Sequence, residues 1–174
     1  MIQTERLLLR RFVPEDAEAL HAFLSDPEVV RYEPYPPQSM AECEAEAARR
    51  AGNPAFWAIC RLEDGQMIGN IYLAQRGFEG WELGYVLARS TWGKGYATEA
   101  CTAMLDHVFA QGAHRVYAQC NPDNIASWRL MERLGMRREA HMKQNVYFVA
   151  NPDPQWLDTY VYAILSEEWR QRLC

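Results

Sequence analysis

Long apolar runs are absent from this sequence, although 49% of its residues are hydrophobic. A membrane-spanning helix needs roughly 20 consecutive apolar residues, and no segment approaches that length. The opening residues, Met1-Ile2-Gln3-Thr4-Glu5-Arg6, lack the apolar core of a signal peptide. We therefore expect a cytoplasmic protein that does not act at a membrane.

Paired cysteines and clustered histidines are also missing. The five cysteines stand far apart, at Cys43, Cys60, Cys101, Cys120 and Cys174. An odd, scattered set disfavours both a disulfide framework and a zinc knuckle. The four histidines are equally scattered, at His21, His107, His114 and His141. Because this spacing is not that of metal ligands, we expect no metal.

Basic residues are in the minority, and the formal net charge is −5. This charge argues against nucleic acid as the ligand and is compatible with a cationic substrate. The chain of 174 residues fits one domain, so we expect a single domain over residues 1–174.

The apolar periodicity predicts a mixed α/β fold around one central, largely antiparallel sheet. Strands are expected over residues 7–12, 56–61, 67–73, 81–87, 114–120, 137–149 and 157–165. Helices are expected to begin at Pro14, at Ser39, within the 96–100 segment and near Asn124, and the last two to end at Gly112 and Gly135. Ser39 with Glu42 forms a capping box for the second helix.

The segment Trp92-Gly93-Lys94-Gly95-Tyr96-Ala97-Thr98 joins an expected strand to an expected helix. Glycines before a helix N-terminus favour binding of a phosphate or another anion, although they also occur in simple tight turns. A P-loop is excluded because Gly95, not Ser or Thr, follows Lys94. A dinucleotide fingerprint is excluded because Thr98 occupies the place of its third glycine.

This loop resembles the pyrophosphate loop of the GNAT superfamily of N-acetyltransferases, Gln/Arg-x-x-Gly-x-Gly/Ala. Gly95-Tyr96-Ala97 match its last positions, while Trp92 replaces the usual Gln or Arg, as in the RimJ/RimL-like branch. Two further segments are similar to that branch. They are Asn121-Pro122-Asp123-Asn124-Ile125-Ala126-Ser127 with Glu132-Arg133-Leu134-Gly135-Met136, and Thr4-Glu5-Arg6-Leu7-Leu8-Leu9-Arg10.

The resemblance implies the GNAT fold, in which two neighbouring strands of the sheet splay apart and the helices flank it. It implies an acetyl-CoA-dependent N-acetyltransferase that uses no metal and transfers the acetyl group directly to a primary amine in a ternary complex. The implied acetyl-CoA contacts are Tyr85, Val86, Leu87, Trp92, Gly93, Lys94, Gly95, Tyr96, Ala97, Thr98, Asn124 and Ser127. For Asn124 a helix cap, and for Lys94 a solvated turn residue, are alternative interpretations.

Two residues are candidates for proton handling. Glu82 is the candidate base, because strand alternation places it with Gly84 and Val86 opposite the apolar face; a surface carboxylate is the alternative. Ser127 shares a helix face with Leu130, so it points inward and is the candidate hydrogen-bond donor to the leaving sulfur. The alternative interpretation of Ser127 is that its hydroxyl only forms a hydrogen bond with the backbone of its own helix. The acid on the last long strand of RimL-like enzymes has no clear counterpart, and Val146 falls near its place.

Two aromatic, proline-rich segments, 32–37 and 148–156, are expected to flank the acceptor. Tyr32, Glu33 and Tyr35 are the candidate acceptor contacts, and Glu33 or Asp153 would attract a cationic amine. Aromatic packing over the core is the alternative. The acceptor is either a protein N-terminus or a small-molecule amine, and the sequence does not decide between them. The oligomeric state is likewise open between a monomer and a homodimer. The functional alternative is a catalytically idle acyl-CoA-binding module that senses or regulates.

Overall fold

The computed structural model describes residues 1–149 and 154–172, which form one eight-stranded sheet with helices on both faces. The strands are β1 (Ile2–Gln3), β2 (Leu7–Arg11), β3 (Phe56–Arg61), β4 (Met67–Arg76), β5 (Gly80–Leu87), β6 (Arg115–Cys120), β7 (Arg137–Tyr147) and β8 (Trp156–Leu165). Their order in the sheet is β1-β2-β3-β4-β5-β6-β8-β7. Only β5 and β6 are parallel neighbours. The predicted mixed, mostly antiparallel fold is confirmed.

The helices begin where the sequence provides caps. They are α1 (Ala17–Leu24), α2 (Met40–Ala51), α3 (Tyr96–Ala110), α4 (Ile125–Arg133) and α5 (Ser166–Gln171), with 3₁₀ turns at η1 (Pro14–Asp16) and η2 (Arg89–Thr91). Ser39 accepts a hydrogen bond from the Glu42 N–H, and the Glu42 carboxylate accepts one from the Ser39 N–H, so the predicted capping box is present. The Asn124 side chain caps α4 by accepting from the Ser127 N–H.

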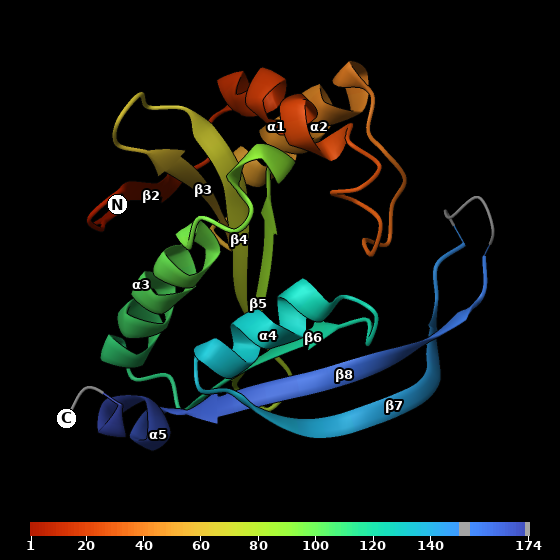
Figure 1. The fold of residues 1–174 in the computed structure, drawn as a ribbon. Helices are drawn as coiled ribbons and strands as arrows, with labels where there is room; N and C mark the ends of the chain where they lie inside the picture. Colours follow the sequence, from red (N-terminus) through yellow and green to blue (C-terminus); the bar gives the residue numbers. More distant parts are fainter. Residues whose placement is uncertain (150–153, 173–174) are drawn as a thin grey trace.

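Two apolar clusters hold the helices against opposite faces of the sheet (Figure 1). On one face, α3, α4 and α5 bury residues such as Met104, Leu130 and Trp169 against β-strand side chains. On the other face, α1 and α2 bury Phe23 and Ala47. In Figure 1 the red-to-orange α1 and α2 accordingly lie together, apart from the green α3 and the cyan α4.

The parallel pair β5–β6 comes apart soon after it forms. Its paired positions are Trp81 with Val116 and Glu82 with Tyr117. Beyond them β5 stays paired with β4 as far as Leu87, while β6 follows β8. The rest of β5 therefore borders an opening between two halves of the sheet, which is the splay that the family resemblance implies.

Strand β4 ends at Arg76 rather than at residue 73, and β7 ends at Tyr147 rather than at residue 149. The terminal helix α5 was not predicted, because six residues are too few for a helical period to stand out. It is fixed by the Leu165 N–H, which donates to Glu168, and by the buried Trp169 indole, which donates to Asp106 at 2.8 Å. Residues 150–153 of the expected 148–156 segment, including the candidate Asp153, lie outside the described residues, as does Cys174. Within the described residues, no helix is long and apolar enough to cross a membrane.

Candidate active site

A cleft of about 1470 Å³ opens where β5 and β6 separate. It is bordered by the end of β5, the glycine loop, the start of α4, the 32–35 segment and the β7–β8 hairpin. The predicted site residues that line it are Tyr32, Glu33, Tyr35, Glu82, Tyr85, Val86, Leu87, Trp92, Gly93, Gly95, Tyr96, Ala97, Thr98, Asn124 and Ser127. Lys94 is not among the lining residues, and its side chain is exposed.

The glycine loop has the backbone geometry of an anion cradle. Gly93 and Gly95 have φ values of 74° and 82°, a left-handed region that glycine adopts at little cost. The Glu99 N–H donates to the Gly95 carbonyl at 3.0 Å, so the N–H groups at the start of α3 have no intrahelical partner. These N–H groups and the positive end of the helix can bind an anion such as a phosphate.

Trp92 takes a structural role at the position where the family pattern has Gln or Arg. Its indole N–H donates to the Leu87 carbonyl at 2.9 Å, while half of the side chain stays exposed. The indole therefore ties the start of the loop to the end of β5.

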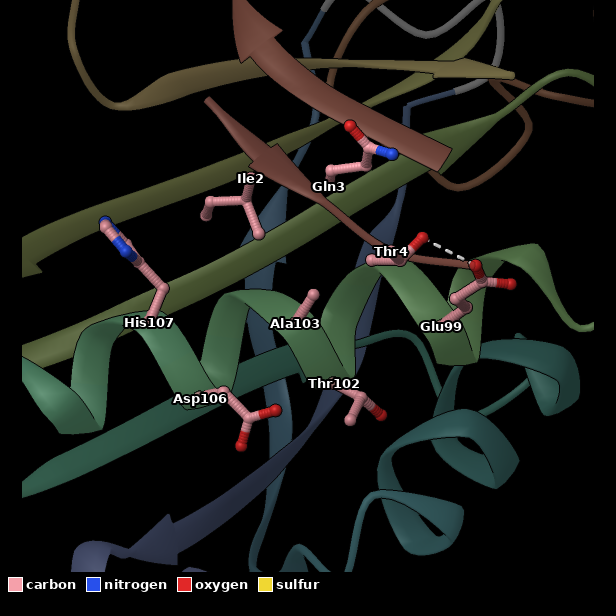
Figure 2. A pocket seen from close by; sticks show the side chains of 8 residues that line it. All are labelled: Ile2, Gln3, Thr4, Glu99, Thr102, Ala103, Asp106 and His107. Atoms are coloured by element: carbon pink, nitrogen blue, oxygen red, sulfur yellow. Dashed lines mark hydrogen bonds between the residues drawn. The ribbon is translucent and has the colours of Figure 1, made fainter. Parts of the chain in front are cut away.

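The N-terminal segment locks the other end of the loop through Glu99, on the first turn of α3. The Glu99 carboxylate accepts from the Thr4 hydroxyl at 2.6 Å, from the Arg6 N–H at 2.8 Å and from Arg6 Nε at 2.7 Å. Figure 2 shows the Thr4 hydroxyl directed at the Glu99 carboxylate, in the lining of a second hollow beside α3. This hollow has a volume of about 590 Å³. Arg6 also donates to the Lys94 carbonyl at 3.0 Å and lies over the Tyr96 ring. These contacts give a structural reason why the segment Thr4–Arg10 resembles the family.

We expect Arg6→Met to weaken acetyl-CoA binding about 3- to 10-fold, because the loop loses its carbonyl and carboxylate anchors although Arg6 does not line the cleft. Calorimetric titration with acetyl-CoA measures the change. Arg115→Met is the matched control, since it removes a similar surface pair, with Glu139 at 2.5 Å, away from the loop. Unchanged affinity in folded Arg6→Met would contradict the anchoring role.

Ser127 and Tyr85 meet across the splayed opening. Their hydroxyl oxygens are 2.9 Å apart, and the Tyr85 hydroxyl is also 3.1 Å from the Ser127 carbonyl. Burial raises the pKa of Tyr85 well above its ordinary value, so the phenol stays protonated. Cys120 lies beside Ser127, and burial raises the pKa of its thiol to about 11. The Ser127 hydroxyl is thus oriented by neutral partners at the edge of the cleft.

Glu82 lines the cleft and, as strand alternation predicts, lies on the face of β5 opposite Leu83, which packs into the core. Its side chain is 29% exposed and lies 3.7 Å from Arg76 Nε. Arg76 is itself held by the Tyr72 hydroxyl, which accepts from Nη2 at 2.6 Å. The carboxylate is therefore in the cleft and also reachable by water.

Asp158 is a cleft acid that the sequence analysis did not identify. It accepts from Lys143 Nζ at 2.8 Å, from His141 Nε2 at 2.7 Å and from the Gln144 N–H at 2.9 Å. Lys143 and these other donors hold the pKa of Asp158 well below its usual range. It is therefore a weak base, and its contacts stabilise an irregular stretch of β7 where Gln144 has φ 45°. Val146, the position named from the sequence, also lines the cleft.

The 32–37 segment forms one wall of the cleft. The Tyr32 hydroxyl donates to the Asp123 carbonyl at 3.1 Å, which connects this segment to the loop before α4. Burial raises the pKa of Glu33 to about 7, against the opposing influence of Tyr35 and Arg50. Burial also raises the pKa of Tyr35 above its ordinary value. At neutral pH, Glu33 is therefore a mixture of carboxylate and carboxylic acid, and attracts a cation less than a free carboxylate does.

This shift predicts a stability difference for Glu33→Gln. Because the folded protein holds a proton that the unfolded chain releases, the wild-type free energy of unfolding falls as the pH rises from about 4.5 to about 7. We expect Glu33→Gln to be more stable than wild type by roughly 2 kcal/mol at pH 8 and equally stable near pH 4. Urea unfolding at both pH values measures this, with exposed Glu63→Gln as control. A pH-independent difference would contradict the assignment.

Comparison with known proteins agrees with the fold and the cleft. Residues 6–137 match the family model described as acetyltransferase (GNAT) domain. The chain is 37% identical over 172 residues to the uncharacterized N-acetyltransferase YnaD of Bacillus subtilis, covering 97% of this chain and 98% of that protein. A GNAT-family acetyltransferase from Bacillus anthracis has a TM-score of 0.89 at 33% identity, over 95% of this chain and 98% of that one.

The chain therefore belongs to the GNAT family of acetyltransferases. It is an N-acetyltransferase, like the named relatives that it matches over nearly its full length. A further relative is the ribosomal protein uS5-alanine N-acetyltransferase of Escherichia coli, 29% identical over 69% of this chain and 62% of that protein. This relative is consistent with the predicted RimJ/RimL-like branch. Within the described ranges, no group of three His, Cys, Asp or Glu side chains is placed to hold a metal ion.

Proposed function

We propose that the protein transfers the acetyl group of acetyl-CoA directly to a primary amine while both substrates occupy the cleft. The observation that supports this most is the meeting of the glycine loop, the open edge of β5 and the Ser127–Tyr85 pair in one cleft. When bound there, acetyl-CoA supplies an activated thioester. As in the sequence-based prediction, we place this chemistry in the cytoplasm.

Each group of cleft residues has a separate proposed role. The loop from Gly93 to Thr98, with Trp92 and Asn124, would hold the pyrophosphate arm, and Tyr85–Leu87 would lie along the pantetheine. Ser127 would donate a hydrogen bond to the sulfur as negative charge develops on it. Lys94 is exposed and does not line the cleft, and its carbonyl accepts from Arg6 Nη1.

Glu82 is the proposed base, because it is the cleft carboxylate beside Gly84, whose missing side chain leaves room for a ligand. Glu33 and Asp158 are less suited. Glu33 lies with Tyr32 and Tyr35 in the wall segment, where we place the acceptor contacts, and Asp158 is committed to three donors.

The test of function is release of free CoA thiol from acetyl-CoA with a panel of primary amines. Turnover above the hydrolysis background supports the transferase. Tight acetyl-CoA binding without turnover of any amine would instead favour an acyl-CoA-binding sensor.

With an accepted amine, Glu82→Gln is expected to lower kcat/KM by roughly 10- to 100-fold below the pH optimum, where the amine is protonated and a base matters most, and by less above it. The pH profile of kcat/KM is the measurement. Asp158→Asn serves as a comparison, because an acid whose pKa is already depressed should leave the shape of the profile unchanged. A Glu82→Gln profile that coincides with wild type would rule out the base.

A further inference from the structure

The acceptor side of the cleft contains two buried polar atoms without a partner among the described residues, Arg50 Nη1 and Asn70 Oδ1. The two residues are 4% and 3% exposed, and both line the cleft. A buried donor or acceptor left unpaired costs about 1–3 kcal/mol, and in folded proteins most such groups have partners. Both atoms are covered in this structure, so a ligand of the cleft that pairs with them would have to displace the side chains that cover them, and the pairing would then remove this cost.

Arg50 is held in place by its other contacts. Its Nε donates to Glu46 Oε1 at 2.7 Å, and its guanidinium carbon lies 4.8 Å from the centre of the Phe56 ring and 5.5 Å from that of Phe12. The guanidinium therefore cannot turn into solvent without losing this packing. A rigid, desolvated guanidinium is the group that proteins use to bind carboxylates.

The charge around Arg50 is not balanced by its neighbours. Glu46 is shared, because its carboxylate also pairs with Arg49 at 2.6 Å, so two cations face one anion. Glu33 also faces Arg50, but it is partly protonated at neutral pH and offsets only part of the excess. Once Glu33 is protonated, Arg49 and Arg50 exceed Glu46 by one positive charge, which an anionic group in the cleft would offset.

The sheet register places Asn70 four residues along the sheet from Glu82, roughly 13 Å, a separation that an extended amino acid with a second donor group spans. Asn70 pairs with Val86 of the splayed strand, on the face that also presents Gly84 and Glu82. Phe56, under Arg50, pairs with Tyr72, which pairs with Gly84. Since adjacent strands lie about 4.8 Å apart, Phe56 is about 10 Å from the β5 backbone.

We propose that Arg50 and Asn70 form a carboxylate-binding subsite, and that the acceptor is a small zwitterion of the amino-acid class. Its carboxylate accepts from Arg50 Nη1, a donor group of the same molecule bonds Asn70 Oδ1, and its reacting amine faces Glu82. The inference rests on the proposed function. A polyamine has no oxygen for Arg50 and brings only positive charge to a positive cluster, so it is disfavoured.

The test uses acceptors that differ only in the carboxylate: an amino acid, its amide and its decarboxylated amine, in lysine and phenylalanine series. We expect wild type to prefer at least one amino acid over its decarboxylated amine by roughly 10-fold or more in kcat/KM, the range of a hydrogen bond to a charged group. Arg50→Met should abolish this preference by raising the KM of the amino acid, and Asn70→Ala should weaken it. Arg115→Met is the control, because Arg115 pairs with Glu139 and does not line the cleft, so its loss should keep the preference.

Calorimetry of the same acceptors with the CoA-bound protein gives a readout that needs no turnover. Arg50→Lys, which keeps the charge, replaces Arg50→Met if that variant does not fold, and should lower the preference by losing the planar donor. Equal use of amines and amino acids by wild type, or an unchanged preference in the Arg50 variant, overturns the subsite but leaves the transferase intact. If no amine is turned over, the proposed function fails, while Arg50-dependent binding of an amino acid still supports the subsite.

Discussion

Gly95→Val is expected to weaken acetyl-CoA binding by ~10-fold or more, a loss of at least about 1.4 kcal/mol of binding free energy. Gly95 has φ 82°, and a β-branched residue is strongly disfavoured there. Its Cβ would also lie 3.4 Å from Arg6 Nη2, the side chain that anchors the loop. To relieve the strain, the backbone must rotate, and the N–H groups at the start of α3 then no longer point together. Calorimetric titration with acetyl-CoA gives the affinity.

Gly65→Val separates this effect from a general loss of stability. Gly65 has a comparable φ of 71°, lies in the β3–β4 turn and does not line the cleft. Both variants should therefore lose stability, of order 1–3 kcal/mol, while only the Gly95 variant loses affinity. Gly95→Val that is folded and binds acetyl-CoA as wild type does would refute the pyrophosphate role of the loop.

The elements that surround the cleft were predictable from local patterns. Capping residues such as Ser39, the alternation along β5 and the glycines before α3 each act within a few residues, so the sequence displays them directly. Helical spacing placed Ser127 on the same helix face as Leu130, and the family resemblance made it a candidate. The resemblance then placed these elements in one fold, and the splay of β5 from β6 agrees with it.

Contacts between distant segments were not predictable. Glu99 is 93 residues from Arg6, and nothing in either local sequence indicates their pairing. Asp158 was overlooked because its position depends on the shifted register between β7 and β8. Arg50 was also overlooked, because in the sequence it resembles the other charged residues on the polar side of an amphipathic helix. Only the packing of α2 on the sheet reveals it as buried.

Ser127→Ala is expected to lower kcat by roughly 10²-fold if Ser127 donates to the leaving sulfur, with little change in acetyl-CoA affinity. A serine hydroxyl is a weak acid beside a thiol, whose ordinary pKa is about 8.5, so a hydrogen bond to the developing thiolate explains the effect better than full proton transfer. Such a bond matters in the transition state more than in the ground state, and so affects kcat rather than binding. Steady-state kinetics with a saturating amine measures it.

Tyr85→Phe is the decisive comparison, because it removes the same 2.9 Å hydrogen bond from the other side and leaves the Ser127 hydroxyl in the cleft. If Ser127 only holds Tyr85 against α4, the two variants should lose activity and stability equally. If Ser127 acts on the sulfur, Tyr85→Phe should retain much more activity than Ser127→Ala, because the hydroxyl is still present and has lost only its orienting partner. Cys120 is a poor substitute for it, because a thiol S–H is only a weak hydrogen-bond donor. Parental kcat in Ser127→Ala would remove Ser127 from the mechanism.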